Sequence, residues 1–206
     1  MLRNLIYFSI SIIVFFCGMI LYGIMLNIRE VTLEEAMQQK GIAKLSDVQL
    51  VISRYNYTMN LFSDTTLVKS YKVVFGQGSG KVKTSVFDNV TPLGTYNVCR
   101  MDDNHEFYKK IFLNYPTERD AAEALKNGTI TKVEYQLIVS NDRDCPPSET
   151  RLGASIGIHG IGEYNFIFKN LPFAFNWTNG SIAVSNENID ELFEVVSLNT
   201  VVEIRD

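Results

Sequence analysis

The stretch of the chain from Leu5 to Asn27 contains no charged side chain. A helix rises 1.5 Å per residue, so about 20 apolar residues cross a hydrocarbon core of about 30 Å. The stretch therefore predicts one helix that spans a membrane. Arg3 precedes it, while Arg29 and Glu30 follow it and offset each other. This slight charge bias favours an inward N-terminus, with the rest of the chain outside.

A cleaved signal peptide is the competing interpretation of this stretch. The apolar part of such a peptide has about 7–15 residues and ends in small residues. The stretch is longer and ends in large apolar residues, and bulky residues at 14–16 precede Cys17, unlike the small residues before a lipid-modified cysteine. We therefore expect an uncleaved anchor. It divides the chain into a cytoplasmic tip and anchor at 1–30, a helical stalk at 31–46 and one domain at 47–206.

Strand patterns dominate the chain beyond the anchor. Thr32 and Glu35 form a capping box for a short helix that Gly41 ends. From residue 47 the apolar residues alternate with polar ones, which is typical of antiparallel strands with short connections. The predicted strands are 48–52, 58–63, 67–75, 91–98, 107–116, 154–160 and 200–204.

Three helices are predicted among these strands. Thr117 precedes the first, over 118–128, and Thr131 and Glu134 form a capping box for the second, over 132–139. The third covers 186–196, with Asn186 as its expected N-cap. The order of elements predicts a mostly β fold with flanking helices (α+β), a single domain built on a mixed sheet or sandwich.

Several kinds of partner are disfavoured by composition and spacing. A net charge of −4 argues against nucleic acid, which favours a concentrated basic face. Gly76, Gly78 and Gly80 lack the following helix that a phosphate-binding loop requires, so they predict a flexible connector between strands. With two histidines and no cysteine pair at ligand spacing, we expect no metal site and no cofactor.

The cysteines of the domain leave two interpretations open. Cys99 and Cys145 would face an oxidising compartment if the domain lies outside the cell, and a disulfide is then possible. Two unpaired thiols fit the sequence equally well.

Two residues carry a hint of chemistry. His159 ends an apolar strand in SIGIHG, and Ser181 follows an Asn-Gly pair in WTNGSIAV. Taken singly, a packed core histidine and a turn serine are the ordinary interpretations. Together they would supply an imidazole base, a nucleophile and nearby glycine amides for an oxyanion. The local residues alone therefore give a weak indication of a hydrolase.

The segments TPLGTY, IGIHG and WTNGSIAVSNENIDEL, in this order, resemble the L,D-transpeptidase catalytic domain family, the YkuD-type domain. The resemblance covers about residues 47–204. In that family a signature close to [ST]-x-G-C follows an H-G strand end, and one subgroup has W-T-x-G-C-I-A-V. The chain departs from the pattern at its centre, because Ser181 stands where the family has its nucleophilic cysteine.

The resemblance implies roles for the residues that match the motif. His159 would activate the nucleophile at position 181, and the backbone oxygen of Gly160 would orient the imidazole. The backbone of Gly180 would lie in the oxyanion region. Substrate contacts would come from the three residues before it, which are Trp177, Thr178 and Asn179.

Two further departures concern substrate binding. Asn179 stands where many relatives have a second histidine, and Ala183 stands where many have an arginine. That arginine is thought to hold a substrate carboxylate, so this contact has no assigned residue here.

The family acts on peptidoglycan stem peptides, so the resemblance implies these as the partner, with no nucleic acid. Members form an acyl-enzyme before a terminal D-alanine, then pass the acyl group to an amine or to water. The expected location is the bacterial inner membrane, single-pass, with the domain on the extracytoplasmic side. The serine leaves three interpretations: an introduced change, a natural pseudoenzyme that only binds peptidoglycan, or a working serine variant.

Four N-x-[ST] sequons begin at Asn56, Asn127, Asn176 and Asn179. In a eukaryotic secretory protein they would predict glycosylated surface sites. The last two lie inside the motif, where a glycan would block the cleft, so we interpret the sequons as accidents of composition.

Overall fold

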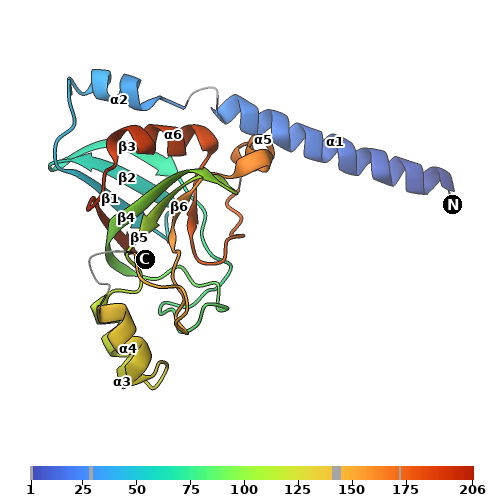
Figure 1. The fold of residues 1–206 in the computed structure, drawn as a ribbon. Coiled ribbons are helices and arrows are strands. Elements are labelled where there is room, and N and C mark those ends of the chain that lie inside the picture. The colour runs from blue at the N-terminus through green and yellow to red at the C-terminus, as the bar shows by residue number, and fades with distance from the viewer. Residues whose placement is uncertain (1, 28–29, 141–144, 172) are drawn as a thin grey trace.

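The structure is a computed structural model that describes residues 2–27, 30–140, 145–171 and 173–206. One long helix, α1 (Leu2–Asn27), projects from a domain built on a sheet (Figure 1). α1 is long and apolar enough to cross a membrane, and its side chains over residues 2–18 are exposed. The apolar stretch thus forms a helix as predicted, while its membrane span stays a prediction.

Eight strands form one mixed sheet in the order β3-β2-β1-β8-β4-β5-β6-β7. Neighbouring strands are antiparallel except for the pairs β1–β8 and β6–β7, which are parallel. The predicted α+β class is therefore confirmed. The strands are β1 (Val48–Ser53), β2 (Thr58–Ser63), β3 (Thr66–Lys72), β4 (Gly94–His105), β5 (Tyr108–Leu113), β6 (Gly157–His159), β7 (Ile182–Ala183) and β8 (Val201–Arg205).

The sheet bends around β4 and closes on itself. The first part of β4 pairs with β8, and the rest pairs with β5, so β4 joins the two halves of the sheet. At the far edge, Val74 and Ala183 exchange backbone hydrogen bonds of 3.0 and 2.9 Å. This bridge connects β7 to the segment after β3. Closure removes an unpaired edge beside the site described below.

One helix, α6 (Asn186–Val195), packs on the sheet and completes the main core (Figure 1). Ile189 and Leu192, three residues apart, are both fully buried, as the predicted helical period requires. The N-cap is Ser185, whose hydroxyl accepts a hydrogen bond from the Asn188 amide. The prediction of Asn186 as the cap was therefore wrong by one residue. The side chain of Asn186 instead bonds to the loop after β6, as described below.

The short helix α2 (Leu33–Gln39) has the predicted capping box of Thr32 and Glu35, and Gly41 follows its end with φ +67°. It packs on the domain, however, where a stalk was expected. Leu33 belongs to the main core, and its amide donates a 2.9 Å hydrogen bond to Glu191 of α6. The segment 31–46 is thus attached to the domain in space.

Helices α3 (Glu118–Lys126) and α4 (Lys132–Val139) form a small lobe at the end of the domain far from α1 (Figure 1). The predicted capping box of Thr131 and Glu134 is present, and Thr117 caps the start of α3 in the same way. The lobe has its own core, made by Ala121, Ala124, Ile130, Ile138 and Leu152.

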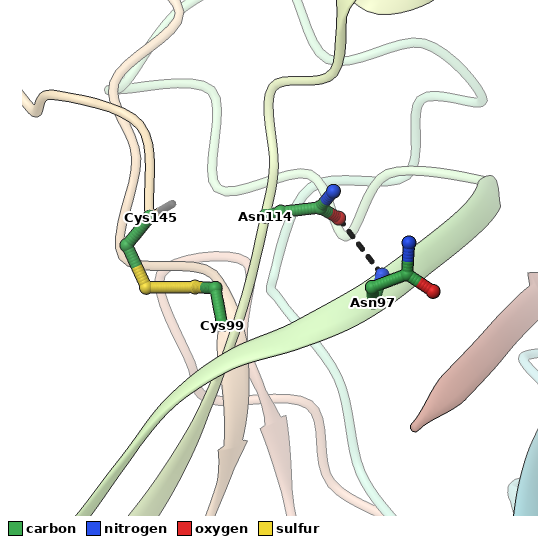
Figure 2. The surroundings of a disulfide bond; sticks show 4 residues. All are labelled: Asn97, Cys99, Asn114 and Cys145. Atoms are coloured by element: carbon green, nitrogen blue, oxygen red, sulfur yellow. Dashed lines mark hydrogen bonds between the residues drawn. A yellow bond between two sulfur atoms is a disulfide. The ribbon is translucent and has the colours of Figure 1, made fainter. Parts of the chain in front are cut away.

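A disulfide joins the segment that follows α4 to strand β4 of the sheet. Cys99 of β4 and Cys145 are bonded, with their Cα atoms 5.2 Å apart (Figure 2). Beside it, the amide of Asn97 donates a 2.8 Å hydrogen bond to the side-chain oxygen of Asn114. The structure therefore selects the disulfide over two free thiols.

Two short elements between β6 and β7 have no counterpart in the predictions. They are a 3-10 turn, η1 (Gly162–Tyr164), and one helix of five residues, α5 (Asn165–Lys169). In Figure 1, α5 lies beside the end of α1 that enters the domain.

Candidate active site

His159 and Ser181 lie on one face of the sheet. β6 and β7 are parallel, with His159 opposite Ala183 and Ile158 opposite Ile182. Side chains alternate between the two faces of a strand. His159 and Ser181, which directly precedes β7, therefore share the face opposite to Ile158 and Ile182, whose side chains are fully buried in the core.

The imidazole of His159 is held by the backbone of the next residue. Its Nδ1 atom lies 2.6 Å from the carbonyl oxygen of Gly160. A carbonyl oxygen only accepts, so Nδ1 carries the hydrogen and Nε2 keeps a lone pair. The ring of Phe107 stacks on the imidazole at 4.9 Å, and the ring of Trp177 meets it edge-on at 5.7 Å. These contacts fix the orientation of the ring.

Burial sets the charge of this histidine. His159 is 2% exposed, and this burial lowers its pKa to about 4. The bond to Gly160 acts in the opposite direction, and the charges of Lys110 and His105 lower the pKa further. His159 is consequently neutral at neutral pH, which is the state of a general base.

Ser181 is 8% exposed, and its hydroxyl donates to the carbonyl oxygen of Ser155 at 3.4 Å. Within the described residues no hydrogen bond joins Ser181 to His159. Catalytic hydrogen bonds are often loose without substrate, and a serine hydroxyl turns readily about its Cα–Cβ bond. The arrangement therefore places a nucleophile and a base on one face without coupling them.

The turn before Ser181 uses polar groups that were predicted to face the substrate. Thr178 is buried, and its hydroxyl donates to the carbonyl oxygen of Ser181 at 2.5 Å. The same hydroxyl accepts from the Gly180 amide at 3.3 Å, and Gly180 has φ +115°. Both groups hold the turn in this structure. Their roles in substrate and oxyanion binding stay predictions.

Two other predicted contact residues flank the turn on its outer side. Trp177 is half-buried between Phe107 and Phe168, with ring centroids 5.4 and 5.7 Å away. Asn179 is exposed at the tip. That both side chains contact a substrate stays a prediction.

The glycine-rich segment packs against the back of this turn. A Cβ atom on Gly76 would lie 2.8 Å from Cα of Gly180 and 2.0 Å from the carbonyl oxygen of Asn89, so only glycine fits there. Gly76 pairs with Thr178, and Gly78 pairs with Val90, in isolated bridges. No helix follows between β3 and β4, as expected for a connector, and the bridges fix its path.

Lys110 is a residue of the site that the sequence did not reveal. It lies opposite His159 in the β5–β6 ladder and is 7% exposed. Burial lowers its pKa to about 8, and its Nζ atom lies 4.8 Å from the ring centroid of Phe112. In the described chain no carboxylate forms an ion pair with it. Its neighbour Lys109 points to the other face and pairs with Asp190 at 2.7 Å.

Asn186 holds the loop that follows His159. Its side-chain oxygen accepts from the amides of Ile161 and Gly162 at 2.9 and 3.0 Å, and its amide donates to the Gly162 oxygen at 3.0 Å. A Cβ atom on Gly160 would lie 2.8 Å from that side-chain oxygen. The first residue of α6 therefore positions the carbonyl that orients His159.

A cavity of about 320 Å³ borders the site on the side of Trp177. Its lining includes Leu26 of α1, Phe168 of α5 and, after α5, Leu171, Phe173 and Phe175. No group of three or more His, Cys, Asp or Glu side chains that could hold a metal lies among the described residues.

Comparison with known proteins adds to this geometry. The model of the L,D-transpeptidase catalytic domain (YkuD) matches residues 47–204. No curated protein matches the chain. Among solved structures, the chain is similar to an L,D-transpeptidase from Xylanimonas cellulosilytica DSM 15894, with 14% identity and a TM-score of 0.46 over 79% of this chain and 62% of the other.

Two more solved structures show the same level of similarity. An L,D-transpeptidase from Mycobacterium smegmatis has 13% identity and a TM-score of 0.46, over 78% of this chain and 59% of the other. The helical cell shape determining protein Pgp2 from Campylobacter jejuni has 14% identity and a TM-score of 0.46, over 84% and 55%. Each match covers less than two thirds of the other chain. Because the family model matches most of the 206 residues, the chain belongs to the L,D-transpeptidase catalytic domain family.

Proposed function

We propose that the protein carries out L,D-transpeptidase-type acyl transfer on peptidoglycan stem peptides, which cross-links or trims them in the bacterial cell envelope. In this proposal Ser181 is the nucleophile position and His159 the base. The backbone at Gly180 faces the oxyanion, and Trp177 and Asn179 contact the peptide beside the turn that Thr178 holds.

One observation carries the proposal. A neutral imidazole, with its Nδ1 hydrogen bonded to Gly160 and its Nε2 lone pair available, shares a sheet face with the side chain at position 181. This is the arrangement that removes a proton from an attacking hydroxyl or thiol. Gly160 takes the place of the carboxylate that orients histidine in many hydrolases.

The serine weakens the reaction in this proposal. A thiol ionises with a pKa of about 8.5, whereas a serine hydroxyl stays protonated and must lose its proton during attack. Ser181 also donates to Ser155 in place of His159. We therefore expect acyl transfer by the unaltered chain to be strongly impaired.

Helix α1 and the disulfide support a proposed location. We propose residues 1–30 as a cytoplasmic tip and anchor in the inner membrane, and residues 47–206 as a catalytic domain on the extracytoplasmic side. Segment 31–46 links the two and packs on the domain. A disulfide such as Cys99–Cys145 persists in oxidising compartments and is rare in the bacterial cytosol, which supports this orientation.

A silent, membrane-anchored peptidoglycan-binding protein is the second candidate. The absence of a thiol at position 181 and the bond from Ser181 to Ser155 favour it. Such a protein would still bind stem peptides but would form no acyl-enzyme.

Acylation of a restored thiol separates the two candidates. Ser181→Cys should be acylated by a carbapenem, seen as a mass increase of the intact protein, and should process a tetrapeptide stem. The unaltered protein serves as a control for stray thiol reaction, because it already carries the free Cys17. His159→Ala in the Ser181→Cys chain should lose activity by about 10²-fold or more, as expected for removal of a general base.

Folded Ser181→Cys protein that neither acylates nor processes the peptide would rule out the enzymatic proposal and leave the binding protein. Turnover by the serine chain at the rate of its cysteine variant would instead contradict the expected impairment.

A further inference from the structure

Exposed apolar side chains gather in the segment between β6 and β7. Five of them, here called the apolar surface, are each 48–63% exposed: Tyr164, Phe166, Ile167, Phe173 and Phe175. Phe173 and Phe175 also line the 320 Å³ cavity, together with Phe168 of α5. Large exposed apolar patches mark a surface that contacts a protein, a ligand or a membrane.

The apolar surface adjoins α1. A Cβ atom on Gly23 would lie 1.7 Å from the carbonyl oxygen of Asn170, so the backbones of α1 and the end of α5 touch. Leu26 of α1 lines the same cavity as Phe173 and Phe175. Figure 1 shows α5 beside the end of α1 nearest the domain. The partly buried residues of α1 at 19, 20 and 24 lie on one helix face.

The position of the contact along α1 fixes its depth. Gly23 lies four residues before the end of α1 at Asn27, which corresponds to about 6 Å at 1.5 Å per residue. Apolar surfaces of peripheral helices enter the boundary between headgroups and acyl chains by about 5–10 Å. If α1 spans the bilayer, α5 therefore lies at the depth of that boundary.

We propose that the apolar surface inserts into the outer boundary of the bilayer beside α1, so that the domain rests on lipid and does not hang free from its anchor. The partner is the lipid itself, because the surface adjoins a helix that lipid already surrounds. The inference rests on the proposed anchoring of α1, but not on acyl transfer.

Quenching of single tryptophans by brominated lipid tests this contact. The full chain is reconstituted in phosphatidylcholine vesicles with or without bromine on the acyl chains. Trp177→Phe removes the one native tryptophan and keeps an aromatic ring. Three reporters are then compared in that background: Phe15→Trp within α1, Phe166→Trp on the apolar surface, and Phe87→Trp as the matched control.

Phe87 is a suitable control because it is 87% exposed and lies in a segment that packs near the lobe of α3 and α4. The Phe15→Trp and Phe166→Trp reporters should each lose about half of their emission in brominated vesicles, because both reach acyl-chain depth. The Phe87→Trp reporter should keep its emission.

If the Phe166→Trp reporter keeps its emission in brominated vesicles as the Phe87→Trp reporter does, the proposal is wrong. This holds whether water or a second copy of the chain covers the surface. An unquenched Phe15→Trp reporter would remove the anchor and the proposal with it. None of these readings depends on acylation, so loss of the proposed enzymatic function would leave them unchanged.

Discussion

His159 experiences opposing effects on its imidazole. Burial and the charges of Lys110 and His105 favour the neutral ring, whereas the Gly160 oxygen favours the protonated one. Burial is the largest effect, so the ring is neutral above a pKa of about 4. His159 therefore binds a proton less readily in the folded protein than in the unfolded chain, where its pKa is about 6.5. Stability linked to His159 is present above pH 6.5 and is lost as the pH falls through about 4.

Replacement of Lys110 should raise the pKa of His159. Lys110→Met keeps the length of the buried side chain and removes its positive charge, so the imidazolium form becomes less unfavourable. A titration of the His159 ring by NMR should show the pKa above the parent value. Lys109→Met is the matched control, because Lys109 pairs with Asp190 on the other face. Equal pKa values of His159 in both variants would contradict the electrostatic role of Lys110.

The sequence identified some of these residues and missed others for a physical reason. His159 and Ser181 stand in motifs that are contiguous in the chain, so their positions were predictable. Lys110 lies on a strand whose register with β6 exists only in the folded sheet. In FYKKIFL, Lys109 and Lys110 look alike, and only the pairing decides which one faces the imidazole.

At the scale of elements, the disulfide that joins β4 to the segment after α4 is expected to stabilise the fold. It closes a separation of 46 residues that contains β5, α3 and α4. In the chain-entropy model, a loop of this length stabilises the fold by about 4 kcal/mol. Cys145→Ser should therefore unfold at a clearly lower urea concentration, followed by near-UV circular dichroism in detergent. Cys17→Ser, which changes an unpaired thiol in α1, should leave the midpoint unchanged.

A Cys145→Ser midpoint equal to that of the parent would mean that the disulfide adds nothing to stability. Reduction of the parent with a mild thiol reagent should give the same urea midpoint as Cys145→Ser. Agreement of the two midpoints shows that the serine side chain itself does not lower stability.

Local signals predicted most elements but not the segment around α5. Capping boxes and two-residue alternation located most helices and strands within a few residues, because these signals lie in adjacent side chains. The predicted strand 91–98 is the exception, since β4 continues to His105. The described residues from Gly162 onward have neither period, since the five side chains of the apolar surface are exposed. Their conformation depends on Asn186 and on contact with α1, both distant in the sequence.

At the scale of the whole molecule, the contact between α1 and the domain includes a position, Gly23, where only glycine fits. Gly23→Leu should push α1 away from Asn170, because no Cβ atom fits there. Backbone amides of α5 should then exchange hydrogen faster in the reconstituted full chain, measured by mass spectrometry. Gly18→Leu is the matched control, since a Cβ atom on Gly18 meets nothing within 4 Å. Equal exchange in both variants would show that the α1–α5 contact does not order α5.

The place of β8 in the sheet has a consequence for biosynthesis. β8 lies between β1 and β4, and Leu50 of β1 pairs with Val202 of β8. The middle of the sheet is therefore missing until residues 201–205 leave the ribosome. By then the rest of the chain has been synthesised, and β1 and β4 each have an unpaired edge. Such edges attract wrong partners. The growing chain must therefore be kept from aggregation until β8 has been made and can pair with β1 and β4.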